Sequence, residues 1–396
     1  GCTTWCPVQV KIVDGRAVHL RGNPHSLANH GKMCPRPNIA LQQVYDPDRV
    51  KVPMRRTNPR KGRDEDPGFV PISWDEAMGL IADKMMELRE NEETHKFTVF
   101  RGRYSYMRDV IYSAVPKIFG SPNGISHSAI CAEAEKFGAF FTEGFWDYRD
   151  YDLEHTRYVL CWGADPLSSN RQVPHAINIW GHVRDRAQIA VIDPRLSATA
   201  AKANEWLPVL PGEDGALAVA IAHVILTEGV WSREFVGDFS DGTNRFIAGE
   251  AVDESLFEEI HTNGVVKWWN LELQERTPEW AETQCGIPAD QIRRVALGFA
   301  DAAPAAISWV SPGAAMQARG GYAAMAAHAL NGLVGSSDHR GGTVQKTKVP
   351  QDKIPAYSDY QDALAKKLSK KPKMDQRGTL AFPAMNKGKS GGGVVT

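Results

Sequence analysis

The stretch YVLCWGADP, at residues 158–166, indicates an α/β fold. Its apolar first half predicts a buried strand, and the Gly, Asp and Pro that follow predict a turn where that strand ends. The same arrangement recurs at residues 189–195 (IAVIDPR) and 305–313 (AAISWVSPG), and apolar helices are predicted at residues 216–226 and 322–333. Strands that alternate with helices predict mainly parallel, doubly wound sheets.

Several strand-end turns of this kind suit a large ligand that carries a nucleotide, because open α/β sheets bind ligands at the carboxyl ends of their strands. For each turn taken alone, ordinary turn chemistry is the better explanation. The sequence contains neither Gly-x-Gly-x-x-Gly nor Gly-x4-Gly-Lys-Ser/Thr. The two best-known phosphate-binding loops are therefore excluded.

The composition is that of a globular protein with two or three domains. The chain has 396 residues and a net charge of −1, with 42% hydrophobic and 23% charged residues, which argues against disorder and against a general nucleic-acid binder. No apolar run approaches the ~20 residues of a membrane span. The chain begins without Met and ends in a glycine run, so we expect a fragment whose lack of a targeting sequence says nothing about its compartment.

Three of the six cysteines, Cys2, Cys6 and Cys34, lie in the first 34 residues. Their x3 and x27 spacings suit a soft metal or an iron–sulfur cluster, while a zinc site or three unrelated thiols remain open. Residues 8–13 and 17–20 predict a hairpin around an Asp-Gly turn. A small β unit of this kind can gather thiolates around one cluster, and we expect the fourth ligand two positions before Gly1.

The segment between residues 60 and 160 predicts further helices and strands. Ser73 caps a helix and Glu76 completes a capping box, with an apolar stripe that follows at helical spacing. Residues 97–100 predict a buried strand, and residues 107–119 and 130–141 predict helices. The Lys-rich run at residues 366–389 predicts a solvated loop, with contact to a partner subunit as the alternative.

These features resemble the molybdopterin oxidoreductases of the dimethyl sulfoxide reductase type. The resemblance rests on the cysteine spacing and on the stretches GNP (22–24), YDPDR (45–49), PM (53–54), ISWDEA (72–77), WGADP (162–166), VIDPR (191–195) and LPGEDGAL (210–217). Within that family, the chain particularly resembles the large, catalytic subunits of respiratory arsenate reductases. The stretches responsible are CTTWC (2–6), RGRYSY (101–106), SHSAICAEAEK (126–136) and DPLSSNRQ (165–172).

The resemblance covers essentially the whole chain, and members of the family are roughly twice as long, so it implies that a second half is absent. It implies an iron–sulfur unit at residues 1–60, truncated at its N-terminus, and a discontinuous α/β domain at 61–155 with the molybdenum ligand and the oxyanion pocket. A Rossmann-like domain for molybdopterin guanine dinucleotide is implied at 156–350. The Lys/Gly-rich residues 351–396 would lead into the missing half.

The resemblance also implies metal ligands. Cys2, Cys6 and Cys34 match three of the four ligands of a 4Fe–4S cluster, and Arg36 matches a basic position between the cluster and the pterin, where it would act in electron relay. Cys131 matches the molybdenum ligand, which is Ser or Asp in some other branches of the family. Formate dehydrogenases have His after this position, whereas here Ala132 follows, which argues against formate as substrate.

Two further sets of residues are assigned by the resemblance. The residues that would surround an arsenate oxyanion are Arg103, Tyr104, His127, Lys136 and Tyr148. Fixed cations and hydroxyl donors are what a tetrahedral dianion requires, and a continuous helix would place His127 and Cys131 on one face. The residues that would bind the guanosine end of bis-molybdopterin guanine dinucleotide are Trp162, Gly163, Asp165, Ser168, Ser169, Asn170, Asp193, Arg195, Gly212, Asp214 and Gly313.

The function implied is reduction of arsenate to arsenite by oxygen-atom transfer at molybdenum, in anaerobic respiration. Electrons would arrive through the 4Fe–4S cluster from an iron–sulfur small subunit, and the family implies the periplasm. Alternatives with the same cofactor are anaerobic arsenite oxidation and reduction of thiosulfate, tetrathionate or selenate. An alternative of another class is a nucleotide-binding α/β protein without redox function.

Overall fold

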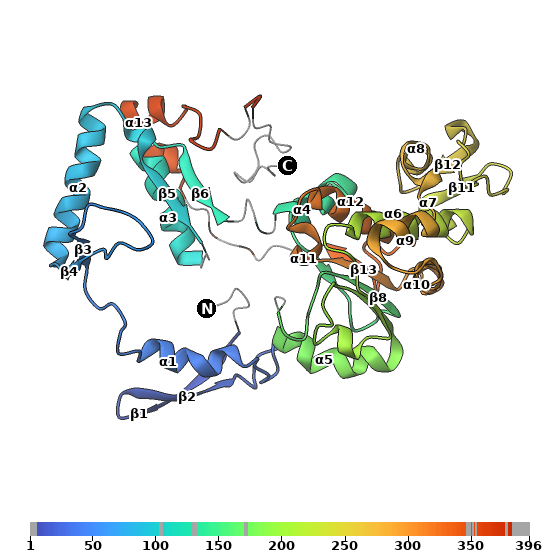
Figure 1. Ribbon diagram of the computed structural model, residues 1–396, viewed down its shortest axis with the longest axis horizontal. Coiled ribbons are helices and arrows are strands. Elements are labelled where there is room, and N and C mark those ends of the chain that lie inside the picture. The colour runs from blue at the N-terminus through green and yellow to red at the C-terminus, as the bar shows by residue number, and fades with distance from the viewer. Residues whose placement is uncertain are drawn as a thin grey trace.

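The computed structural model describes residues 6–102, 106–127, 131, 133–169, 173–345, 350, 352, 355–376 and 379–381, without the side chains of residues 106–109. Two lobes and a small N-terminal unit make up this part of the chain (Figure 1). The larger lobe is built on a parallel sheet, and the smaller one on α2 and α3.

The sheet of the larger lobe has the parallel order β10-β9-β8-β13. Its strands are β8 Tyr158–Trp162, β9 Gln188–Ile192, β10 Glu205–Leu207 and β13 Ala306–Val310. The ranges predicted for β8, β9 and β13 agree with the observed strands to within one residue at each end. In chain order, β9 and β10 are added on one side of β8, and β13 is added on its other side. The strand order therefore reverses between β8 and β13, and open α/β sheets bind their ligands at such a reversal.

Helices cover both faces of this sheet, as the doubly wound prediction requires (Figure 1). Alternate residues of β8 point to opposite faces: Leu160 and Trp162 join one core cluster, and Cys161 joins the other. The helices involved are α5 Val173–Arg186 on one face and α6 Asp214–Thr227, α10 Ala289–Asp301 and α12 Gly320–Leu333 on the other. α6 is buried on almost every side, which is why its sequence is apolar throughout.

Three further elements complete this lobe near the sheet. They are α4 Glu133–Glu143, the short helix α11 Pro312–Ala315, and the antiparallel pair of β7 Arg149–Tyr151 with β14 Thr343–Gln345. An extension packs aromatic side chains around Trp231. Its elements are α7 Arg233–Val236, β11 Gly237–Phe239, β12 Phe257–Glu259, α8 Val265–Leu271 and α9 Pro278–Cys285.

The smaller lobe confirms its predicted helices and the strand predicted at residues 97–100, but not the burial of that strand. Its elements are β3 Met54–Arg56, β4 Phe69–Pro71, α2 Trp74–Glu90, β5 Thr98–Arg101, α3 Tyr106–Phe119, β6 Asn123–Ser126 and α13 Ala363–Leu368. Ser73 caps α2 by accepting a hydrogen bond from the Glu76 N–H, while the Glu76 carboxylate accepts from Arg55. In β5, Phe100 is 72% exposed, because this two-stranded parallel pair is not covered there.

The structure corrects the expected domain boundaries at two places. The Lys-rich segment is not simply a loop, since α13 packs against the smaller lobe and Lys367 pairs with Glu92 at 2.9 Å. In addition, α4 and β7, expected in the 61–155 domain, pack on α12 and β14 of the sheet lobe. The chain therefore crosses from one lobe to the other near residue 131.

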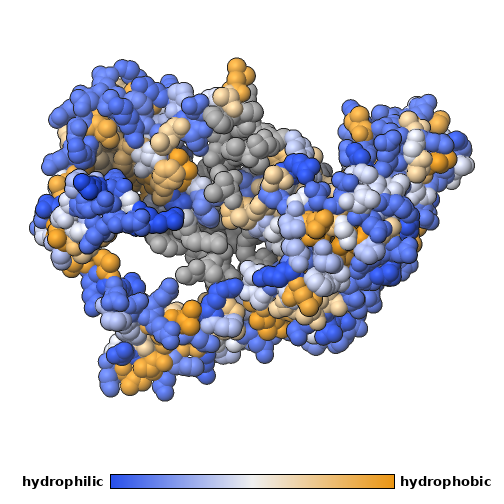
Figure 2. Space-filling view, in the orientation of Figure 1, coloured by the Kyte–Doolittle hydropathy of each residue, from blue (hydrophilic) through white to orange (hydrophobic). Residues whose placement is uncertain are grey.

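The N-terminal unit contains the predicted hairpin. β1 Val8–Val13 and β2 Arg16–Gly22 are antiparallel, Asp14 and Gly15 adopt positive φ in the turn between them, and α1 Ala40–Val44 follows. Apolar side chains of this hairpin lie on the surface (Figure 2). Among the described residues, no helix is both long and apolar enough to cross a membrane.

Candidate active site

Cys131 lies in a turn between the two lobes and not inside a helix. Its thiol is free and half-buried, and α4 begins only at Glu133. His127 follows β6 directly. The prediction that a continuous helix places His127 and Cys131 on one face falls partly on residues 128–130, which lie outside the described residues, whereas Cys131 itself lies in a turn. A thiol in a turn is less confined by its own backbone than a thiol inside a helix.

Lys136 and Tyr148 are brought together beside this turn. The Lys136 Nζ lies 4.7 Å from the centre of the Tyr148 ring, and both side chains are half-buried. A cation over an aromatic face is held in place while its remaining N–H groups stay available to an anion. His127 is also half-buried, whereas Arg103 and Tyr104 lie outside the described residues.

The position of Lys136 depends on a close crossing of α4 over α12. A Cβ on Gly138 would lie 2.6 Å from the Ala324 carbonyl carbon, so only glycine permits this approach. On the other side of the contact, Gly321 makes room for the ring of Phe137, which is almost fully buried. Small residues at the crossing thus let the helix that follows Cys131 dock on the sheet lobe.

The N-terminal unit holds two of the predicted cluster ligands in adjoining loops. Cys34 is buried and Cys6 is half-buried, whereas Cys2 lies outside the described residues. The Asn29 amide donates to the carbonyls of Pro7 and Lys32 at 3.1 and 3.0 Å and so ties the two cysteine-bearing loops together. Within the described residues, no group of three His, Cys, Asp or Glu side chains is placed to hold a metal.

Arg36 connects this unit to the sheet lobe. Its Nη1 lies 3.9 Å from the Cys34 Sγ, and its Nη2 donates to the Ser168 carbonyl at 2.6 Å. A guanidinium at this position attracts negative charge placed near the cysteine loop. Arg36 thus lies between the cysteine loop and the loop after β8.

The loops after β8 and β13 touch at two glycines. A Cβ on Gly163, whose φ is +56°, would lie 2.3 Å from the Ala314 nitrogen, and one on Gly313 would lie 2.4 Å from the Gly163 oxygen. The Gly163 N–H donates to the Ile192 carbonyl at 2.9 Å. This N–H is therefore already used inside the fold, and the two glycines serve close packing at the reversal point of the sheet.

Asp165 and its neighbours link the loop after β8 to the loop after β9. One Asp165 carboxylate oxygen accepts from the Thr199 hydroxyl at 2.6 Å and from the Thr199 N–H at 3.1 Å. The other oxygen accepts from the Ser168 hydroxyl, and Arg195 lies 3.9 Å away. Only 4% of the surface of Asp165 is exposed. Asp165 therefore holds the loops at the carboxyl ends of β8 and β9 together and does not face a ligand. Ser169 lies exposed beyond it, and Asn170 is outside the described residues.

Trp162 lies in the core below this edge and not on it. Its indole N–H donates to the Ser308 hydroxyl at 2.8 Å, and Ser308 donates in turn to the Ala327 carbonyl at 2.6 Å. The fully buried Asn331 amide closes the network with the backbone of Ser308. Trp162 thus fixes β8, β13 and α12 relative to one another and cannot contact a nucleotide directly.

Asp193, Gly212 and Asp214 gather at the ends of β9 and β10. Asp193 accepts from the Arg195 N–H at 2.8 Å, and Gly212 has a positive φ just before α6. Burial raises the pKa of Asp214 to about 6, more than the hydrogen bond from Gln317 lowers it, and the negative charges of Asp193 and Glu213 add to the rise. A buried carboxylate that is under-satisfied in this way is suited to accept from a ligand's N–H or O–H groups.

We expect Asp214→Asn to stabilise the cofactor-free protein at alkaline pH. A folded-state pKa near 6, above the ordinary 3.8, means that the ionised carboxylate costs up to about 3 kcal/mol above pH 6, and that this cost vanishes toward pH 4. Denaturant unfolding at pH 4, 6 and 8 measures the difference. Asp241→Asn is the control, because the backbone N–H of Thr243 lowers the pKa of Asp241. An Asp214→Asn protein less stable than wild type at pH 8 would contradict the interpretation.

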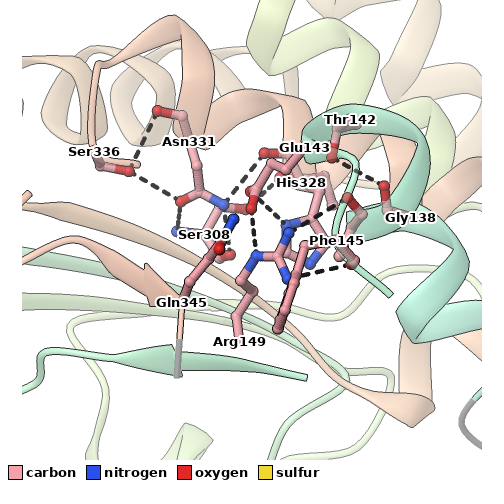
Figure 3. Close-up of polar contacts among 12 residues, drawn as sticks. Gly138, Thr142, Glu143, Phe145, Arg149, Ser308, His328, Asn331, Ser336 and Gln345 are labelled. Carbon is pink, nitrogen blue, oxygen red and sulfur yellow. Dashed lines mark hydrogen bonds and ion pairs between the residues drawn. The ribbon is translucent and has the colours of Figure 1, made fainter. Parts of the chain in front are cut away.

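Three ionisable residues, two buried and one half-buried, were not predicted from the sequence. They are Glu143, Arg149 and His328, which meet between α4, β7 and α12 (Figure 3). They also line a groove of about 1300 Å³ beside α6 and α12. Glu143 and Arg149 lie close in sequence but carry no motif, and His328 comes from more than 180 residues later. The available signal for His328 was its position inside α12, a helix made mostly of small and apolar residues.

Comparisons with known protein families and sequences match this chain to one family over almost its whole length. The molybdopterin oxidoreductase profile matches residues 49–383, and the molybdopterin oxidoreductase Fe4S4 domain profile matches residues 1–46. The chain is 52% identical over 397 residues to the arsenate respiratory reductase molybdopterin-containing subunit ArrA of Shewanella sp. (strain ANA-3). It is 54% identical over 401 residues to ArrA of Chrysiogenes arsenatis. These alignments cover 100% of this chain and 46% and 47% of the two relatives.

More distant relatives match as well. The thiosulfate reductase molybdopterin-containing subunit PhsA of Salmonella typhimurium is 29% identical over 398 residues, covering 100% of this chain and 48% of PhsA. The chain thus spans about half the length of the curated relatives that it matches. The acetylene hydratase of Pelobacter acetylenicus has a similar structure, with a TM-score of 0.64 and 21% identity over 84% of this chain and 42% of that one. This likeness supports the α/β fold alone.

Proposed function

This chain belongs to the molybdopterin oxidoreductase family, with its Fe4S4 domain at the N-terminus, and on that premise we propose that it is the catalytic part of a respiratory arsenate reductase. The enzyme would reduce arsenate to arsenite by oxygen-atom transfer. Identity above 50% to two ArrA subunits along the whole chain supports this choice over the other substrates of the family. Because the matching family is one of oxidoreductases, membership argues against the alternative of a nucleotide-binding protein without redox function.

The observation that carries the proposal is the Lys136–Tyr148 pair beside Cys131. Lys136 is five residues after Cys131 and its ammonium is held over the Tyr148 ring. Arsenate at neutral pH is largely a dianion, and it gains most from a fixed cation with hydroxyl donors nearby. Arg103, Tyr104 and His127 are proposed to complete this pocket. Neutralising the oxyanion charge there lowers the barrier to breaking an arsenic–oxygen bond.

The chain's residues fit the two cofactors that the family uses. Cys131, a free thiol in an open turn, is proposed as the protein ligand of molybdenum, and Cys2, Cys6 and Cys34 as ligands of the 4Fe–4S cluster. The loops around Asp193, Gly212 and Asp214 would bind the guanine dinucleotide, with Gly163, Gly313 and Asp165 shaping the edge. When bound, these groups supply the oxygen-atom transfer and the two electrons for it.

The remaining proposals concern the surroundings of the enzyme. The electrons would come from an iron–sulfur small subunit, and the enzyme would act in the periplasm during anaerobic respiration. Arg36, between Cys34 and the Ser168 carbonyl, would stabilise added electron density on the path into the active site. The Ser168 carbonyl, which accepts from its Nη2 at 2.6 Å, holds the guanidinium at this place.

A substrate panel on the purified full-length enzyme tests the function. With a reduced dye as electron donor, we expect turnover of arsenate, and little with thiosulfate, tetrathionate or selenate; with an oxidised dye, arsenite oxidation measures the reverse direction. A preference for a sulfur or selenium oxyanion would overturn the assignment.

Cys131→Ala tests the metal ligand in the same preparation. We expect an altered molybdenum spectrum and a loss of turnover of on the order of 1000-fold or more, because the thiolate is the only protein atom proposed to bind the metal. Cys285→Ala, which removes a buried thiol on the far helix α9, is the matched control and should leave the spectrum unchanged. An unaltered spectrum in Cys131→Ala would remove that residue as a ligand.

A further inference from the structure

Arg149 is a buried cation immediately after Tyr148. Its side chain is 1% exposed, and its Nε donates to the Glu143 carboxylate, whose side chain is 17% exposed (Figure 3). Its Nη1 and Nη2 donate to the carbonyls of Phe145 and Ala139, both at 3.4 Å. The guanidinium also lies 4.6 Å from the centre of the Phe145 ring. Every described contact of this cation is thus with α4 or the turn that follows it.

These contacts place Arg149 at the C-terminal end of α4. Gly144, with φ of +71°, ends the helix by donating to the Phe140 carbonyl at 2.9 Å. A cation there interacts favourably with the helix dipole and with carbonyls that lack a partner in the next turn. Arg149 therefore fixes the path of the chain as it returns along α4 after the turn.

The returning chain carries Tyr148 back to Lys136. Lys136 and Glu143 are seven residues apart, so they lie on the same side of α4 about two turns from each other. The Tyr148–Arg149 segment spans that distance: the Arg149 guanidinium binds Glu143 at one end, and the Tyr148 ring lies under the Lys136 ammonium at the other. A shift of Arg149 must therefore move the tyrosine relative to the lysine.

α12 holds Glu143 from the other side. His328, 2% exposed, has its Nδ1 3.6 Å from the second oxygen of Glu143. Burial raises the pKa of Glu143, but its neighbours His328 and Arg149 together lower it further, so that the net shift is downward. Glu143 is thus an ionised residue shared by α4, β7 and α12, next to the crossing at Gly138.

We propose that Glu143 and Arg149 are positioning residues for the oxyanion pocket: their ion pair holds the Tyr148 ring and hydroxyl in register with Lys136. This inference rests on the proposed function, since it assigns a purpose to a pair one residue away from a proposed arsenate contact. The pair itself does not touch the substrate. It acts through Tyr148, and that distinguishes it from an ion pair that only stabilises the fold.

The variants are chosen so that neither member of the Glu143–Arg149 pair is left without the other. Removing one member of a buried pair strands the other and costs several kcal/mol, whereas removing both is much milder. The test is therefore the double variant Glu143→Met with Arg149→Met, together with Arg149→Lys, which keeps the charge but loses the planar fork. Arg294→Lys is the matched control, because Arg294 pairs with Glu205 at 2.7 Å on the far edge of the sheet.

The measurement uses the full-length, metal-loaded enzyme with arsenate as the probe. We expect the double variant and Arg149→Lys to raise KM for arsenate or lower kcat/KM by about 10- to 100-fold, as a misplaced contact group does. Molybdenum and iron contents should be unchanged, and Arg294→Lys should behave as wild type. If the double variant fails to fold, Arg149→Lys alone carries the test.

A cycle with Tyr148→Phe separates positioning from stability. If the pair acts through the tyrosine hydroxyl, its removal has little further effect on kcat/KM once that hydroxyl is gone. Full additivity of the two effects, or an unchanged kcat/KM in Arg149→Lys and the double variant, would overturn the inference. A wild-type enzyme that does not turn over arsenate would instead overturn the proposed function, so the two failures are distinguishable.

Discussion

Replacing Lys136 by alanine in the full-length enzyme is expected to lower kcat/KM for arsenate by about 100- to 1000-fold, the loss typical of removing one preorganised group that stabilises an anionic transition state. The ammonium is held over the Tyr148 ring, so it is already placed before substrate arrives. Molybdenum and iron contents should not change, because neither proposed cofactor set includes Lys136.

Steady-state kinetics and metal analysis of the same preparation check this result. Lys136→Arg should recover part of the rate, since it restores the charge but not the compact ammonium. Lys267→Ala, at an exposed position on α8, is the control and should leave kcat/KM unchanged. An unaffected turnover in Lys136→Ala with intact metal content would show that the oxyanion site lies elsewhere.

Gly138→Ala is expected to destabilise the protein and to impair turnover together. The added Cβ would lie 2.6 and 2.7 Å from the carbonyl carbon and oxygen of Ala324, and backbone cannot yield as a flexible side chain does. Overpacking of this kind costs about 1–3 kcal/mol. Because α4 must move away from α12, Lys136 and the turn at Cys131 should be displaced as well.

Gly181→Ala provides a stringent control, since Gly181 is also a helix glycine but a Cβ there would meet nothing within 4 Å. Alanine in that helix should stabilise by about 0.5–1 kcal/mol. Thermal melts and kcat/KM of the two variants measure the contrast. A Gly138→Ala protein as stable and as active as wild type would mean that the α4–α12 crossing does not position the site.

The sheet was predictable because its signal is local. Strands such as β8 are buried on both faces, so an unbroken apolar run followed by turn residues marks each one. The helix cap at Ser73 and the hairpin at Asp14-Gly15 were predictable for the same reason, since each depends on residues within one turn of chain.

The parts that were mispredicted depend on contacts between distant segments. The helix predicted from residue 130 begins only at Glu133, because Cys131 lies in a turn where the chain crosses between the lobes. The burial of Trp162 follows from Ser308 and Asn331, which lie about 150 residues later. The Glu143–Arg149–His328 cluster likewise joins three elements, and no spacing rule connects residues so far apart.

The pairing of β7 with β14 has a consequence for the order in which this protein can assemble. Tyr151 pairs with Thr343, so β7 acquires its partner strand only after about 190 further residues have been synthesised. At ~5–20 residues per second, this takes on the order of 10–40 s. During that time the Tyr148–Arg149 segment lacks its neighbouring strand, and α4 lacks α12. Metal insertion at the proposed ligand Cys131 is therefore expected to follow completion of the sheet lobe and not to accompany its synthesis.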